Sequence, residues 1–242
     1  NLLFILFFLV FILSEALIFL SGDRTAFFNI NLSAIFIILF SQKLLKLRLI
    51  TLSLSILLLI IISLINPTAK ERVFDQTIKQ MNLVKDKEKP FTEGLYIFSK
   101  EHTDHYIAAY RMYLDNKILG VGVKNFRKIC KYEKYKVSES SCAPHPHNTY
   151  VQILSETGII GFLFLLTALI YFSKNLVKHL VLKIRGNPYF TDFEICVLSG
   201  IAIYLWPIIP TGSIFNNWLN ILLIMNLPFL IWSKQSKKTT IN

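Results

Sequence analysis

The sequence predicts an all-α, polytopic membrane protein. Hydrophobic residues make up 53% of the 242 residues, and the mean hydropathy is +0.50. These residues gather in continuous blocks, and an α-helix needs about 20 apolar residues to cross about 30 Å of hydrocarbon. The blocks show no alternation of apolar and polar residues. They therefore indicate helices, which satisfy their own backbone hydrogen bonds in lipid.

Six such blocks can be distinguished along the chain. They cover residues 2–20, 26–41, 48–65, 149–172, 193–210 and 214–232. Clusters of Lys and Arg follow the second, fourth and sixth blocks, so all three clusters can lie on one side, the cytoplasm. We therefore expect about six transmembrane helices. The first block follows Asn1 directly, without the basic start or cleavage site of a signal peptide, and we expect further helices to precede it in a longer protein.

This orientation gives the chain a periplasmic side. The side receives a short loop at 21–25, a long loop at 66–148 and a tight turn near 210–212. The long loop carries most of the basic residues, but loops beyond about 60 residues are translocated largely regardless of charge. The expected organisation is three transmembrane helices in 1–65, a periplasmic loop domain in 66–148, three transmembrane helices in 149–232 and a cytoplasmic basic tail in 233–242.

The long loop has the composition of a small folded domain. Apolar residues recur at helical spacing at Ile107, Tyr110 and Leu114, which predicts one amphipathic helix from about 98 to 114. The sequence Gly-Val-Gly at 120–122 then breaks this helix. Two cysteines, Cys130 and Cys142, also lie in the loop. In an oxidising compartment they form either a disulfide or two free thiols, and the spacing leaves both open.

The net charge of +11 comes mainly from loop residues. This placement indicates topology signals together with an anionic ligand in the large loop. The chain carries no nucleic-acid-binding motif, so nucleic acid is not an expected partner.

The stretch with the most chemical information runs from Pro144 to Gly161. Prolines flank His145 and hold an extended approach to the fourth block, and Asn148 is a good N-cap for its helix. His147 then lies next to the N-terminus of this helix, at the periplasmic surface of the membrane. An imidazole there can act as a general base, and the positive end of the helix dipole helps to keep it neutral. The alternative is that His147 only caps or packs at the interface.

Three segments of the chain resemble a known family. His-x-His-Asn at 145–148 is followed by an aromatic residue, Gln, Glu and Gly-x-x-Gly. Ser-Gly-Asp-Arg-Thr-Ala-Phe at 21–27 follows a membrane helix. An arginine-bearing segment at 111–115 precedes Gly-x-Gly-x-x-Asn-Phe at 120–126. In this order, and across nearly the whole chain, the segments resemble the O-antigen ligase and O-antigen polymerase family.

The resemblance implies a GT-C-like helical membrane fold and transfer of a glycan from undecaprenyl diphosphate. It implies that His147 is the catalytic base and that Arg24 and Arg111 hold the donor diphosphate. Supporting residues are expected at His145, Asn148, Gln152, Glu156, Gly120 and Gly122. Each role has an alternative from the residues alone. Arg24 could extend to the lipid interface, Arg111 could pair with Asp115, and Glu156 could only join two helices.

The chemistry is consistent with these assignments. Undecaprenyl diphosphate is a good leaving group, so the enzyme has to neutralise negative charge and activate a sugar hydroxyl. Arginine donates to phosphate oxygens through its fork, and histidine accepts the hydroxyl proton. We expect an inverting glycosyltransferase that uses neither a metal nor another cofactor. His102 and His105 could form half of a zinc site, but no further ligand motif supports one.

The predicted activity is an O-antigen ligase that moves a polysaccharide to lipid A–core at the bacterial inner membrane, with its active site facing the periplasm. Its partners are the undecaprenyl-diphosphate-linked donor, a lipid A–core or glycan acceptor, and membrane lipids. A polysaccharide polymerase would use the same site with a glycan acceptor, and a protein O-glycosyltransferase would use a protein. A transporter of lipid-linked sugars is the alternative from another class, but it would place its polar residues at mid-depth and often show internal repeats.

Overall fold

The computed structural model describes residues 2–83 and 95–239, and in this part of the chain all regular secondary structure is helical, with no strand. The elements are α1 (Leu2–Ser21), α2 (Arg24–Phe40), α3 (Leu45–Ile65), α4 (Pro67–Lys70), the π-helical turn η1 (Glu71–Asp75), α5 (Gln76–Gln80), α6 (Lys100–Asp115), α7 (Phe126–Ile129), α8 (Thr149–Ile184), α9 (Asp192–Tyr204), α10 (Asn217–Ile224) and α11 (Asn226–Thr239). The prediction of an all-α fold is confirmed for these residues.

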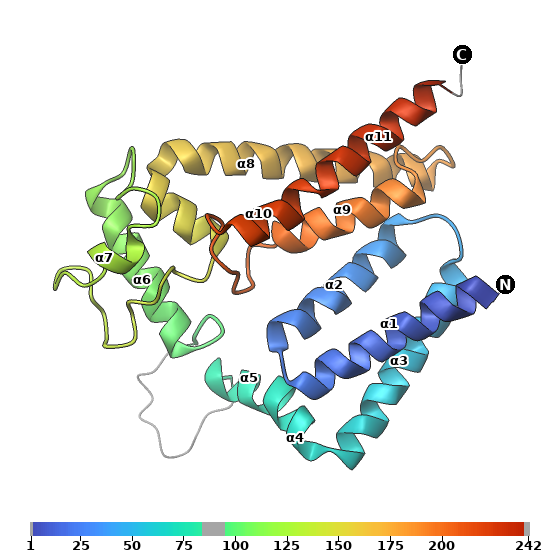
Figure 1. The fold of residues 1–242 in the computed structure, drawn as a ribbon, viewed down its shortest axis with the longest axis horizontal. Coiled ribbons are helices and arrows are strands. Elements are labelled where there is room, and N and C mark those ends of the chain that lie inside the picture. The colour runs from blue at the N-terminus through green and yellow to red at the C-terminus, as the bar shows by residue number, and fades with distance from the viewer. Residues whose placement is uncertain (1, 84–94, 240–242) are drawn as a thin grey trace.

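The long helices form two groups that meet along one contact (Figure 1). Helix α1 packs against α2 and α3, helix α9 packs against α11, and α2 packs against α9 to join the groups. A core cluster centred on Phe36 of α2 and Ile195 of α9 fills this junction. Both ends of the described chain lie far from α6 and α7 (Figure 1). The two termini thus lie at one end of the fold, and α6 and α7 lie at the opposite end.

Each of the six predicted apolar blocks is helical, but the helices differ in length. Two helices are long and apolar enough to cross a membrane, α3 with 21 residues and α8 with 36 residues, while α2 and residues 5–21 of α1 are shorter apolar helices. Helix α9 ends at Tyr204, and the last block is divided at Met225 into α10 and α11. Part of the predicted loop domain, residues 84–94, and the end of the predicted tail, 240–242, lie outside the described residues.

The segment from α4 to α5 folds back over the ends of the first helices. Pro67 begins α4, where its missing N–H costs no hydrogen bond. Val73 is buried with Phe19 of α1 in a small core, and the ring of the neighbouring Phe74 lies 6.0 Å from that of Phe19. This packing holds α5, and with it Gln80, over the start of α2.

The predicted helix near 98–114 is present as α6, but it buries a different face. Ile107, Tyr110 and Leu114 are 39%, 54% and 44% exposed. The buried face carries Ala108 and Ala109 instead, with Met112, and packs against a core that includes Phe126, Cys130 and Tyr135. Small alanine side chains allow the close approach of α6 to its neighbours, which the larger apolar residues on the other face would prevent.

Helix α8 is kinked at Gly158, where the backbone leaves helical geometry (φ 67°, ψ −164°). The turn that contains Gly120 fits into this kink. Backbone N–H groups of Val121 and Gly122 donate to the carbonyls of Ser155 and Glu156, both at 2.9 Å, and Ile159 N–H donates to Lys117 O at 2.8 Å. A Cβ on Gly158 would lie 2.3 Å from Ile118 O, so the two segments meet backbone to backbone.

Replacing Gly158 by Ala tests this contact. The added methyl group collides with a carbonyl oxygen and requires a positive φ, so we expect the free energy of unfolding to fall by about 2–4 kcal/mol. Gly186→Ala is the matched control. Gly186 also has a positive φ, but a Cβ there would meet nothing within 4 Å. Thermal denaturation of the detergent-solubilised variants measures the difference, and equal melting temperatures would contradict the proposed contact.

Candidate functional site

His147 lies directly before α8 on a tightly held segment. Asn148 is the N-cap of α8, since its side chain accepts hydrogen bonds from the N–H groups of Tyr150 at 3.0 Å and Val151 at 3.1 Å. The Asn148 amide also donates to Pro207 O at 2.8 Å. His147 itself has a positive φ of 54°, which a non-glycine residue adopts only when its surroundings impose it. These contacts therefore hold the backbone at His147 in place.

Three further imidazoles gather around His147. The ring centroid of His145 lies 4.2 Å from that of His147, and those of His102 and His105 each lie 5.5 Å from it. His102 and His105 stand one turn apart on α6, so a single face of that helix presents both rings to the loop before α8. The sequence suggests for these two residues only half of a zinc site. Their spacing of three residues was the signal that they share a face.

Hydrogen bonds fix the tautomers of two rings in the cluster. His105 Nδ1 lies 2.9 Å from Ser141 O, and His145 Nε2 lies 3.3 Å from Thr211 O. Because a carbonyl oxygen only accepts, each of these nitrogens carries the proton. Thr211 also donates its backbone N–H to His147 O at 2.8 Å. The loop between α9 and α10 thus holds both histidines of the His-x-His motif, a contact that the sequence did not indicate.

The cluster keeps His147 uncharged near neutral pH. Burial, and after it the three neighbouring imidazoles, lower the pKa of His147 from the ordinary value of 6.5 to about 4. Burial is also the largest cause that lowers the pKa values of His102 and His145. The helix dipole invoked from the sequence is therefore not needed to explain a neutral imidazole. A neutral ring has a free lone pair that can accept a proton.

Arg24 lines a cavity that also reaches His102. Asp23 caps α2 by accepting the N–H of Ala26 at 2.9 Å, which places Arg24 at the first position of the helix. The Arg24 Nη1 donates to Gln80 Oε1 of α5 at 2.6 Å. The cavity has a volume of about 320 Å³, and the side chains of Arg24, Gln80 and His102 form part of its wall.

The cavity as a whole is amphiphilic, because aromatic side chains form much of the remaining wall. Aromatic side chains from three segments line it, namely Phe27, Phe28, Phe74 and Phe98. His102 therefore lies between the cavity that contains Arg24 and the ring of His147.

Arg111 lies apart from this cluster. It is nine residues beyond His102 on α6, which at 3.6 residues per turn puts the two side chains on opposite faces. The exposed Arg111 side chain donates from Nη1 to Lys136 O at 3.2 Å. The alternative partner, Asp115, is bound instead by Lys134 at 2.7 Å and by Tyr135 Oη at 2.9 Å.

Two further predicted residues, Glu156 and Gln152, join α8 to neighbouring segments. Glu156 accepts the backbone N–H groups of Lys124 and Phe126, both at 3.0 Å, and so anchors the turn after Gly122 to α8. Gln152 donates to Ser213 Oγ at 2.9 Å and accepts the N–H of Ile214 at 3.1 Å. Both side chains are buried, and they connect α8 to the turn after α6 and to the loop between α9 and α10.

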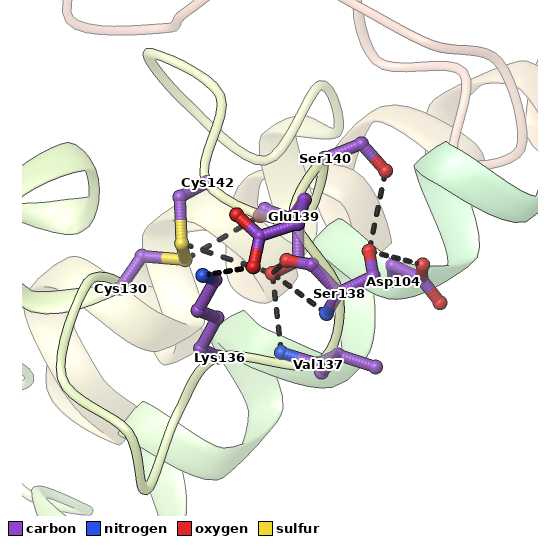
Figure 2. A network of polar contacts seen from close by, with 9 residues as sticks. Asp104, Cys130, Lys136, Val137, Ser138, Glu139, Ser140 and Cys142 are labelled. Carbon is purple, nitrogen blue, oxygen red and sulfur yellow. Dashed lines mark hydrogen bonds and ion pairs between the residues drawn. A yellow bond between two sulfur atoms is a disulfide. The ribbon is translucent and has the colours of Figure 1, made fainter.

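A disulfide between Cys130 and Cys142 closes the loop behind the cluster (Figure 2). It resolves the alternative left open by the sequence. Figure 2 also shows the polar network beside it, in which Ser138 donates to Asp104 Oδ2 of α6 at 2.7 Å. Ser141 O, next to Cys142, is the acceptor that binds His105. The disulfide thereby ties the segment before the His-x-His motif to α7 and α6.

In the described ranges 2–83 and 95–239, no group of three or more His, Cys, Asp or Glu side chains has an arrangement that could hold a metal ion. In His105 and His145, a hydrogen bond to a backbone carbonyl occupies one nitrogen of each ring. Burial lowers the pKa values of His102, His145 and His147 in this site, and Arg24 lines the adjoining cavity.

Removing the disulfide tests its structural role. A disulfide that closes a loop of this size typically contributes about 2–4 kcal/mol. We expect the double variant Cys130→Ser, Cys142→Ser to melt at a lower temperature and to lose order in the histidine loop. The control is Cys196→Ser, because Cys196 is an exposed free cysteine on α9. If the double variant melted as the control does, the disulfide would not hold this segment.

A comparison with known families finds one family whose model matches this chain. A family model described as O-antigen ligase matches residues 7–166, well over half of the chain. This stretch contains Arg24, α6, the disulfide and His147. No curated protein and no solved structure matches the chain. The family and the two long apolar helices indicate a membrane protein that acts on lipid-linked glycans. The chain belongs to the O-antigen ligase family.

Proposed function

We propose that this protein transfers a glycan from undecaprenyl diphosphate to lipid A–core on the periplasmic face of the inner membrane. Family membership supports an activity of the O-antigen ligase or polymerase type. One observation carries the assignment of residues: a neutral imidazole, His147, and a guanidinium, Arg24, belong to one site through the ring of His102.

The cavity at Arg24 has the chemistry that a polyprenyl diphosphate requires. The Arg24 guanidinium and the Gln80 amide can donate to phosphate oxygens. The aromatic wall offers an apolar surface to the first isoprenyl units, and α2 continues from this point as an apolar helix. An amphiphilic donor can thus place its headgroup at Arg24 while its chain follows the membrane helices.

The proposed reaction uses the imidazole of His147 and the guanidinium of Arg24 in different roles. A hydroxyl oxygen of the acceptor attacks the anomeric carbon, and the bond from that carbon to the diphosphate oxygen breaks. His147 accepts the hydroxyl proton, and Arg24 neutralises the charge that develops on the diphosphate. Attack from the side opposite the leaving group inverts the anomeric centre. The pKa of His147 keeps it in the basic form in the free enzyme, and the anionic donor then raises its affinity for the proton.

The proposed topology has six crossings with the three basic clusters in the cytoplasm. Contacts among the loops assigned to the periplasm support it. Arg24 of the first loop binds Gln80 of the second, and Thr211 of the third binds His147. These contacts join segments that the alternation of crossings assigns to the same side. We do not extend the diphosphate site to Arg111, because its side chain lies on the opposite face of α6 from His102.

His147→Gln is the direct test of the base. Glutamine keeps the approximate size of the ring but cannot accept the proton, so we expect transfer to fall by about two to four orders of magnitude. The assay uses full-length protein in membranes, a lipid-linked donor, and either lipid A–core or a glycan as acceptor. The wild-type preference between these acceptors separates a ligase from a polymerase. Retained transfer by a correctly inserted variant would remove His147 from the mechanism.

Arg24→Lys tests the guanidinium. Lysine keeps the charge but loses the fork that binds two phosphate oxygens. One hydrogen bond to a charged group contributes about 1.5–3 kcal/mol, so we expect the donor KM to rise by roughly 10- to 100-fold. The matched control is Arg127→Lys on α7, where the side chain is exposed. Unchanged donor kinetics for Arg24→Lys would indicate that the side chain only extends to the lipid interface.

A further inference from the structure

We propose that His102 is a second catalytic residue, which takes up a proton when the anionic donor binds and gives it to the departing diphosphate. This inference rests on the proposed function, because it assumes that the cavity at Arg24 holds the donor. It extends that function by naming the general acid that protonates the leaving diphosphate. It also gives the proton a route from the base, His147, to the acid, His102.

His102 is suited to this role by its place between the two parts of the site. Its side chain lines the cavity that contains Arg24 and Gln80, and its ring lies 5.5 Å from the ring of His147. His105, on the same face of α6, is similarly close to His147 but does not line that cavity, and its Nδ1–H is held by Ser141 O. His102 is therefore the member of the cluster that contacts both the cavity and the base.

Ser99 allows the His102 ring to change its charge. Ser99 Oγ lies 2.8 Å from His102 Nδ1 and also caps α6 by accepting the His102 backbone N–H at 3.3 Å. A hydroxyl can donate to an unprotonated Nδ1 or accept from a protonated one by rotating its hydrogen. Both forms of the ring thus keep their hydrogen bond to Ser99. Within residues 2–83 and 95–239, Ser99 at Nδ1 is the hydrogen-bond partner of the ring, and we assign Nε2 to the ligand.

The groups that face His102 explain why the donor would change its charge. On α6 these are His105, the ring of Tyr106 at 6.5 Å and the carboxylate of Glu101. Arg24 approaches from α2, and His147 from the loop before α8. Burial first, followed by the interaction with His105, lowers the pKa of His102 in the free protein; Glu101 opposes this shift and Arg24 adds to it. A diphosphate diester brings two negative charges into the same cavity, and nearby negative charge favours the imidazolium.

The resulting step balances in protons and charge. As the acceptor oxygen bonds to the anomeric carbon and the bond to the diphosphate breaks, His147 takes the hydroxyl proton. Nε2 of His102 gives its proton to the departing diphosphate and keeps the proton on Nδ1 that binds Ser99. The imidazolium of His147 then returns a proton to His102. The acceptor proton has in effect moved to the diphosphate, and no electrons are gained or lost.

The sign of the pH dependence follows from this exchange. If binding takes up a proton, the donor binds more tightly as the pH falls. The dependence is confined to the interval between the lowered pKa of His102 in the free protein and its higher pKa in the complex. Within that interval the Kd increases by up to tenfold per pH unit as the pH rises. Below the interval His102 is already protonated, and the dependence ends.

The test measures proton uptake directly. The probe is a sugar joined through diphosphate to a short isoprenyl chain, whose two phosphates carry fixed charges near neutral pH. Isothermal titration calorimetry of the full-length protein in nanodiscs, in two phosphate-free buffers with different ionisation enthalpies, gives the number of protons bound. We expect close to one proton for the wild-type protein at a pH at least about one unit above the pKa of His102 in the free protein and below its pKa in the complex. We expect close to none for His102→Gln, and retained uptake for the matched variant His105→Gln.

The outcomes separate this inference from the function on which it rests. Binding of the probe without proton uptake by the wild-type protein would overturn the role of His102 and leave the donor site intact. Unchanged uptake in His102→Gln would do the same. Failure of the wild-type protein to bind the probe would overturn the proposed function and this inference together. If His102→Gln does not fold, the wild-type pH dependence of Kd decides the question alone, and a flat profile from pH 5 to 8 would refute the inference.

Discussion

The site depends on one contact between backbones, the insertion of the turn at Gly120 into the kink of α8 at Gly158. His147 precedes α8, whereas His102 and His105 stand on α6, more than forty residues earlier in the chain. The N–H groups of Val121 and Gly122 bind carbonyls that the kink exposes, and Glu156 binds the N–H groups that follow. This docking sets the histidine face of α6 against the start of α8, together with the hydrogen bonds that join α6 to the segment before His147.

The electrostatic character of the site comes from burial combined with like groups. Burial disfavours a charged imidazole at His147, and the neighbouring imidazoles add to this effect. The pKa of His147 falls to about 4 for this reason. Arg24 remains a cation, because a guanidinium stays protonated in proteins. The site therefore combines a fixed positive charge with bases that an anionic ligand can recharge, which is suited to binding a diphosphate and moving a proton.

The loop domain is held together by covalent and polar links more than by an apolar core. The disulfide at Cys130, the bond between Ser138 and Asp104, and the bond between Ser141 and His105 all connect the segment before His147 to α6 or α7. Around them lies only a small core of alanines, Met112 and Phe126. Specific bonds therefore contribute to the geometry of the histidines alongside this core.

The sequence alone determined the helical class, the positions of the apolar helices and the cap at Asn148, because these follow from local composition and spacing. It also indicated His147, Arg24 and the glycines of the turn through the family pattern. Only the tertiary structure decided which face of α6 is buried, that the cysteines pair, and that His102 joins Arg24 to His147. Local periodicity favoured Ile107, Tyr110 and Leu114 as the packed face. The alanine face packs instead, because close approach of α6 to α7 and α8 depends on the partner surfaces, which the sequence of α6 does not contain.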